Sequence, residues 1–147
     1  MLITIAAVSA VLIGGVCIAI QAPINGALGR MTGEPLLAAA ISFAVGLVPL
    51  TALALVRGGV PAAATLTALP WWAWIGGPLG AVYVVASIWA APQVGVLTVA
   101  AAAVLGQLSG ALALDAVGAF GMPAHPIELK RIAAVAMVAG GVILSRI

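Results

Sequence analysis

The sequence has very little charge. Only 5% of its 147 residues are charged, 65% are apolar, and the mean hydropathy is +1.35. A soluble domain carries about 25% charged residues, so a chain with this composition cannot cover a globular surface with polar groups. The shortage of charge therefore excludes an ordinary soluble domain. Because a protein surface within a bilayer is apolar, the composition predicts an integral membrane protein that is surrounded by the lipid bilayer.

Basic residues, cysteine and histidine are also scarce, and each shortage excludes a class of function. Five Lys and Arg residues are too few for the clustered basic patch of a nucleic-acid-binding protein. Cys17 is the single cysteine, and the single histidine, His125, lies far from it between two prolines. Neither an intrachain disulfide nor a metal site is expected, and no cofactor is predicted.

The sequence also lacks a basic stretch before its first apolar run and charged residues in the middle of its apolar runs. No basic stretch precedes the first run, which exceeds the roughly 7–15 residues of a signal-peptide core, so a retained helix is expected. No Asp, Glu, Lys, Arg or His lies mid-run, which argues against a deep proton-coupling carboxylate. The sequence also lacks a nucleophile–base pair and a phosphate-binding loop, so an enzyme is not expected.

Long apolar runs are what the sequence has instead. A helix that crosses the hydrocarbon core needs about 20 apolar residues, and backbone groups in lipid must bond within the helix. The runs predict spanning helices at about 2–28, 35–56, 71–91, 94–114 and 128–145. The predicted fold is all-α, a single transmembrane domain over residues 1–147 that is built as a bundle of five transmembrane helices.

The charged residues test this segmentation, because all of them fall at or beyond the ends of the predicted spans. Five spans place the termini on opposite sides of the membrane. Arg57, Lys130 and Arg131 then lie on the N-terminal side, and Arg30 and Arg146 lie on the other. The positive-inside rule gives almost no bias for three against two. Either the N-terminus is weakly cytoplasmic, or the protein inserts both ways, which would suit an antiparallel homodimer.

Polar residues interrupt the first span near its end. Gln21 and Asn25 are four residues apart, so their amides share one helix face. Pro23 lies between them and removes a backbone hydrogen bond. One interpretation is a pair of amides that faces a cavity. The alternative is a helix end at headgroup depth, where polar residues are solvated.

The third span carries small and polar residues on one face. Gly76, Gly80, Tyr83 and Ser87 recur at spacings of four, three and four residues. The glycines favour a packing seam, because small residues let transmembrane helices approach closely. Tyr83 and Ser87 could line a polar path. Tryptophans at the start of this span and Trp89 near its end are typical of the two membrane interfaces.

The fourth span contains an amide near its middle. Gln107 lies between Gly106 and Gly110, which form a GxxxG helix-contact motif. A buried amide in lipid needs a partner, so Gln107 should face protein or water, either as a link between helices or as a substrate contact. Asp115 ends this span and opposes the helix dipole, so we expect a basic partner or solvent beside it.

These residues resemble motifs of the YdcZ family of small inner-membrane proteins. The resemblance rests on Gln21-Ala-Pro-Ile-Asn25-Gly26-Ala-Leu-Gly29-Arg30, on Gly80-Ala-Val-Tyr83, and on Gly106-Gln107 with Asp115-Ala-Val-Gly118-Ala-Phe120-Gly121. It implies membership of the drug/metabolite transporter superfamily, whose larger members have two inverted five-helix halves. A five-helix chain would then work as an antiparallel dimer. Small multidrug resistance exporters are less similar, because they use a glutamate in the first helix that is missing here.

The leading hypothesis is a small-molecule transporter of the bacterial inner membrane that works as an exporter. It would alternate access around a central polar and aromatic cavity between two antiparallel copies, or between this chain and an oppositely oriented paralogue. The predicted substrate-binding residues are Gln21, Asn25, Ser42, Tyr83, Ser87, Trp89 and Gln107. Amides, hydroxyls and aromatic rings favour a neutral or zwitterionic solute, or a cation over an aromatic ring. The alternatives are a narrow channel and a non-transporting structural or accessory subunit.

Overall fold

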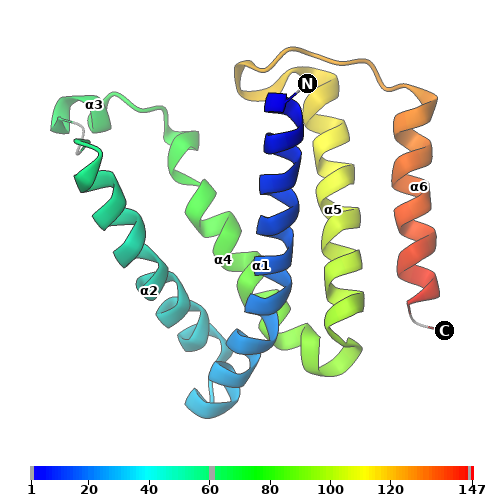
Figure 1. Ribbon diagram of the computed structural model, residues 1–147, viewed down its shortest axis with the longest axis horizontal. Coiled ribbons are helices and arrows are strands. Elements are labelled where there is room, and N and C mark those ends of the chain that lie inside the picture. The colour runs from blue at the N-terminus through cyan, green and yellow to red at the C-terminus, as the bar shows by residue number, and fades with distance from the viewer. Residues whose placement is uncertain (1, 60–61, 146) are drawn as a thin grey trace. The chain divides into compact units, whose positions relative to one another are not determined.

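The computed structural model of the chain describes residues 2–59, 62–145 and 147. Over these residues the chain forms helices joined by turns and loops, with no strand, which confirms the all-α prediction (Figure 1). Arg146, one of the residues in the charge count, lies outside the described residues. The elements are α1 (Leu2–Thr32), α2 (Pro35–Val56), α3 (Ala63–Thr67), η1 (Trp71–Trp74), α4 (Gly76–Val94), α5 (Val96–Val117), η2 (Ala119–Gly121) and α6 (Leu129–Leu144).

Four stretches of the described chain are long and apolar enough to cross a membrane: Thr4–Thr32, Pro35–Val56, Trp71–Val94 and Val96–Val117. They confirm the first four predicted spans. The last helix, α6, has 16 residues and is about 24 Å long, somewhat less than the hydrocarbon core of roughly 30 Å. A fifth spanning helix therefore stays a prediction.

Two helices extend past the ends that their prolines and glycines suggest. α1 continues beyond residue 28 to Thr32, with Pro23 inside it. α4 likewise includes Pro92 and runs to Val94. A proline removes one backbone hydrogen bond without ending either helix, whereas the left-handed glycines that follow do end them. Gly33 has φ 74° and Gly95 has φ 83°.

The observed bounds of the third and fourth spans also differ from the predicted ones. The tryptophans at the start of the third span form the 3₁₀ turn η1, and α4 begins only at Gly76. α5 runs from Val96 to Val117 instead of 94–114, because Gly95 precedes it and the left-handed Gly118 ends it. Glu128 caps the start of α6 at the predicted boundary of the fifth span.

The chain divides into two compact units, Met1–Pro92 and Gln93–Ile147, here called the N-terminal and C-terminal units. In the N-terminal unit, α1 and α2 form a hairpin whose closed end also contacts α4. The core there consists of Ala38, Ala39, Val84 and Ile88. Gly29 permits this contact, because a Cβ atom at that position would lie 3.0 Å from Cγ2 of Ile88.

The C-terminal unit is a hairpin of α5 and α6. Near one end of the hairpin, the Oγ1 atom of Thr98 lies 3.3 Å from Oγ of Ser145. Near the other end, Asp115 forms an ion pair with Arg131, which confirms the expected basic partner for this carboxylate. The intervening loop folds back on α5, since the backbone N–H of His125 donates to the carbonyl oxygen of Asp115 at 2.8 Å.

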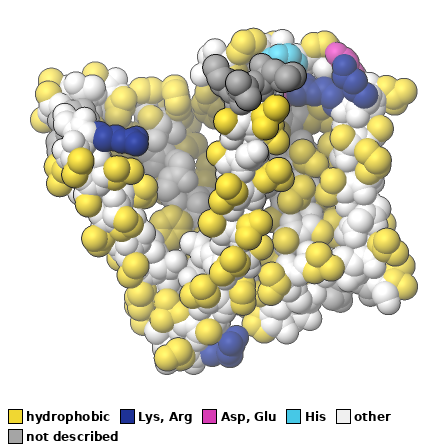
Figure 2. All heavy atoms as spheres, in the orientation of Figure 1, with side chains coloured by type: hydrophobic (Ala, Val, Ile, Leu, Met, Phe, Trp, Pro, Cys, Tyr) yellow, Lys and Arg dark blue, Asp and Glu magenta, His cyan; other side chains and the backbone are white. Residues whose placement is uncertain are grey.

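The surface of both units is strongly apolar. Val11 and Val82 are among many large aliphatic side chains that are more than two-thirds exposed, at 75% and 69%. Figure 2 shows hydrophobic side chains along the helices and basic side chains only near helix ends. Arg30, for example, lies in the last turn of α1. This distribution is that of a protein whose helices face lipid.

Candidate functional site

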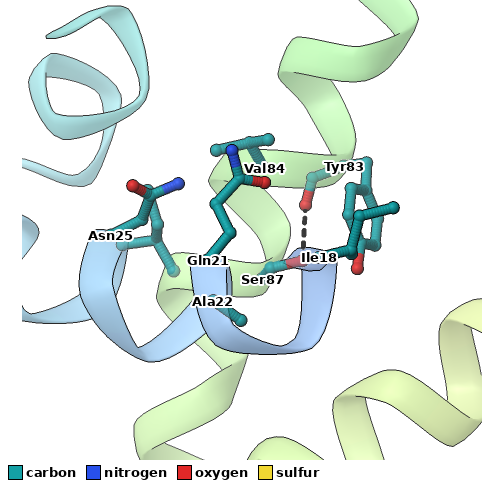
Figure 3. Close-up of a pocket in the computed structure, with 8 residues that line it drawn as sticks. Ile18, Gln21, Ala22, Asn25, Tyr83, Val84 and Ser87 are labelled. Atoms are coloured by element: carbon teal, nitrogen blue, oxygen red, sulfur yellow. Dashed lines mark hydrogen bonds between the residues drawn. The ribbon is translucent and has the colours of Figure 1, made fainter. Parts of the chain in front are cut away.

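A small polar cavity lies between α1 and α4 of the N-terminal unit (Figure 3). It brings together four of the seven residues predicted to bind substrate, Gln21, Asn25, Tyr83 and Ser87. The other lining residues are Ile18, Ala22, Val84 and Ile88. The polar residues of the first and third predicted spans therefore meet at one place.

The spacing of the lining residues explains how the cavity forms. On α1 they lie three and four residues apart, and on α4 they form adjacent pairs one turn apart, so each set occupies one helix face. Ala22 is buried at 7% exposure, and its small side chain keeps α1 close to α4. Ile18 and Ala22 were not predicted to line the site because they are apolar. Their spacing from Gln21 and Asn25 does, however, place them on the same helix face as these two amides.

Hydrogen bonding differs between the two walls. On α4, Ser87 is 5% exposed, and its hydroxyl donates to the carbonyl oxygen of Tyr83 at 2.8 Å (Figure 3). On α1, Asn25 is 4% exposed, yet its amide has no hydrogen-bond partner among the described residues. The Gln21 amide, which extends toward Val84, likewise bonds to no described residue.

An unpaired amide is costly in this setting. Transfer of an amide from water to an apolar environment costs roughly 1–3 kcal/mol in proteins when no hydrogen bond replaces those to water. A bilayer supplies no water to reduce that cost. The amide of Asn25 therefore gains from a partner outside the chain, which can be water, a solute or another protein chain, and Gln21 beside it is exposed and open to the same partners.

The cavity is too small to hold a solute in this conformation. Its volume is about 10 Å³, close to the minimum for one water molecule. A ligand-binding pocket for a small molecule usually has a volume of about 300–1,000 Å³. The polar side chains of α1 and α4 can therefore form only part of a binding site in this conformation. A complete site requires either further residues or a separation of the two helices.

Three predicted site residues lie away from this cavity. Ser42 is half-buried on α2 and is not part of the lining. Trp89 lines a different, apolar groove of about 520 Å³ between α2 and α4. Gln107 is exposed on α5, in the C-terminal unit. Within the N-terminal unit, Ser42 and Trp89 are thus not part of the polar cavity.

The GxxxG motif of α5 makes no close contact within the C-terminal unit. A Cβ atom on Gly106 or Gly110 would meet nothing within 4 Å among the described residues. A close helix contact at this motif therefore stays a prediction. Gly80 does make such a contact, since its Cβ atom would lie 3.5 Å from the Phe43 ring.

No group of three or more His, Cys, Asp or Glu side chains that could hold a metal ion occurs in residues 2–59, 62–145 and 147. The site is instead a set of amides, hydroxyls and aromatic rings in an apolar surrounding. Such groups bind by hydrogen bonds and shape, and they offer no activated nucleophile.

The sequence matches a known protein family over nearly its whole length. Residues 6–144 match the family described as "Putative inner membrane exporter, YdcZ". The chain belongs to the YdcZ family. The match confirms the resemblance carried by the motifs, and with the four apolar helices it identifies a multi-pass inner membrane protein of a transporter family. The description of the family is that of an exporter. No curated protein and no solved structure shows significant similarity to the chain.

Proposed function

We propose that this YdcZ-family chain exports a small molecule by alternating access and that two antiparallel copies form the transport pathway. In this proposal residues 1–147 act as one transmembrane domain with five spans, and α6 is the fifth. The amide of Asn25 carries the proposal, because this residue is 4% exposed, lines the cavity and makes no described hydrogen bond, which supports a place where a solute binds.

The second copy follows from what the single chain leaves incomplete. The cavity between α1 and α4 has room for about one water molecule. Gln107 is exposed on α5, beside two glycines with open space. In transporters with inverted repeats, the site lies near the midplane at the repeat interface. A second copy in the opposite orientation would supply partners for these groups and bring Ser42, Trp89 and Gln107 toward the pathway.

The chemistry of the candidate residues limits the substrate. The predicted lining offers amides, hydroxyls, a phenol and an indole, but no charged side chain. A solute with full net charge would lose its hydration without an opposite charge in return. We therefore propose a neutral or zwitterionic polar solute. A cation is a further possibility where it can stack on Trp89 or Tyr83.

Membrane topology tests the dimer most simply. Reporters that are active on one side of the membrane only would be fused after Ile147. Activity of both reporters is expected, because the Lys and Arg count is nearly balanced. The double variant K130Q/R131Q serves as the control. It leaves one basic residue, Arg57, on the N-terminal side, and should shift the signal toward one reporter. A single active reporter in the unmodified protein would contradict the antiparallel homodimer and would favour an oppositely oriented partner chain.

A further inference from the structure

The C-terminal unit has a groove of its own, which the proposed transport pathway does not use. It lies between α5 and α6, has a volume of about 160 Å³ and is open on one side. Its apolar walls are Leu108, Ala111 and Leu112 on α5 and Ala134 and Val135 on α6. The α5 residues share one helix face, so the groove runs along the hairpin for about 10 Å from Leu108 to Asp115.

One end of this groove is charged. Asp115 and Arg131 line it there and form an ion pair, with side chains that are 29% and 32% exposed. The pair leaves hydrogen-bonding capacity on both partners. Nη1 of Arg131 is buried and has no partner among the described residues. The ion pair involves Oδ2 of Asp115, so the second carboxylate oxygen has no described partner.

The positions of the two charges in their helices are also unusual. Arg131 lies in the first turn of α6, and Asp115 lies in the last turn of α5. Each charge opposes the dipole of its own helix. The reverse arrangement would hold the hairpin together equally well and suit both dipoles. A purely structural ion pair does not explain this choice.

Neighbouring charged residues do not change the net charge at this end of the groove. Lys130 is 79% exposed and pairs with Glu128 at 2.6 Å, so the two compensate each other. The ion pair of the groove is itself neutral overall. Its best complement is therefore a ligand that carries one negative and one positive group next to each other, followed by an apolar tail.

We propose that this groove binds a phospholipid with an ethanolamine headgroup. The phosphate lies on the Arg131 guanidinium, the ammonium donates to the free carboxylate oxygen of Asp115, and an acyl chain lies between α5 and α6. The guanidinium presents several donors to a phosphate. Phospholipids surround α5 and α6 in the membrane, and charged pockets between transmembrane helices are known sites for lipid headgroups.

The charge pattern separates this lipid from related ones. A phosphatidylcholine headgroup has a quaternary ammonium that cannot donate a hydrogen bond to Asp115. A phosphatidylglycerol headgroup brings a negative charge with no cation for the carboxylate. Loss of a hydrogen bond between charged groups weakens binding, so the ethanolamine lipid should bind at least about tenfold more tightly than either.

Native mass spectrometry of the full-length chain in a neutral detergent would measure this directly. The three lipids would be titrated with identical acyl chains. R131Q should weaken all three by about tenfold, because it removes the phosphate contact. D115N should remove only the preference for the ethanolamine lipid. K130Q removes the same charge as R131Q one residue away and should change nothing.

A further variant guards against a loss of folding in R131Q. A111W fills the groove and keeps the ion pair, so it should also weaken lipid binding by about tenfold while circular dichroism shows an unchanged helix content. Equal binding of the three lipids to the unmodified protein would overturn the proposal. So would equal lipid binding by R131Q and K130Q, or competition by free phosphoethanolamine at the concentration of the lipid.

Discussion

Two buried polar side chains, one in each unit, differ in their hydrogen bonding. In the N-terminal unit, Asn25 is 4% exposed and has no described hydrogen-bond partner. In the C-terminal unit, Thr98 is 8% exposed, but its hydroxyl lies against Ser145 of the neighbouring helix. Both side chains are buried and polar. One is satisfied within the chain and the other is not, and this difference indicates which is structural and which is available to a ligand.

The same contrast appears in how the helices are held together. The N-terminal unit closes on small residues, with Gly29 against Ile88 and with Ala38 and Ala39 in the core. The C-terminal unit is joined by polar contacts near both ends of its hairpin, Thr98 with Ser145 and Asp115 with Arg131. Close packing of small residues is a common way to associate helices in a membrane, and it leaves polar groups free for other uses.

The largest expected effect is a break in the packing of the N-terminal unit. Gly29→Leu would place side-chain atoms where a Cβ atom alone already lies 3.0 Å from Ile88. Overpacking of this kind costs about 1–3 kcal/mol, so the melting temperature in detergent should fall. Gly14→Leu is the matched control, since its Cβ atom would meet nothing within 4 Å. An equal fall for both variants would show that helix propensity or membrane insertion, and not this contact, decides the result.

The next effect concerns the ion pair of the C-terminal unit. Asp115→Asn leaves Arg131 without its charged partner, and the protein should lose about 1–2 kcal/mol of stability, because the site is only partly exposed. The exchanged pair D115R/R131D restores the attraction and places each charge favourably for its helix dipole. It should therefore melt higher than D115N. A double variant that is as unstable as the single one would contradict this account of the pair.

A change at Asn25 should act in the opposite direction on stability. Asn25→Leu removes an amide that has no described partner, so stability should rise by about 1 kcal/mol while export falls. Thermal unfolding followed by circular dichroism measures the first effect. Accumulation of a transported solute in cells measures the second. A fall in stability would show that the amide has a structural partner in the assembled protein.

The smallest effect is expected at the satisfied polar contact. Thr98→Val replaces a hydroxyl that lies 3.3 Å from Oγ of Ser145 with a methyl group of similar size. Stability should fall by about 0.5–1 kcal/mol, with export unchanged. Together N25L and T98V sharpen the comparison between the units. N25L is expected to raise stability and lower export, whereas T98V is expected to lower stability slightly and leave export unchanged.

Much of the fold could be predicted from hydrophobicity alone. The apolar runs and the charges at their ends located four spanning helices to within a few residues. The errors lie where proline and glycine compete to end a helix. Pro23 and Pro92 are accommodated inside α1 and α4, and the left-handed Gly33 and Gly95 end them. Sequence spacing does not reveal which of two such signals prevails, because the outcome depends on the backbone conformation after the helix.

The candidate site could be predicted only within single helices. The four-residue spacing of Gln21 and Asn25 predicts a shared face, and the same holds for Tyr83 and Ser87. That these two faces meet depends on tertiary packing around Gly29 and Ala22, which helical periodicity cannot supply. Gly106 and Gly110 beside Gln107 gave an equally clear signal, but a Cβ atom at either glycine would meet nothing within 4 Å among the described residues. A motif on one helix does not identify the partner helix.

Accessibility of position 25 to water tests the central claim most directly. Asn25→Cys would be made in a Cys17→Ser background, which removes the single native thiol, and treated with a charged, membrane-impermeant maleimide. Ala39→Cys is the control, since Ala39 is equally buried, at 3% exposure, and lies near the same end of the α1–α2 hairpin. A cavity on a transport pathway predicts that the cysteine at position 25 is modified and the one at position 39 is not. If neither reacts, Asn25 lies in a closed packing contact, and the proposed pathway between α1 and α4 is wrong.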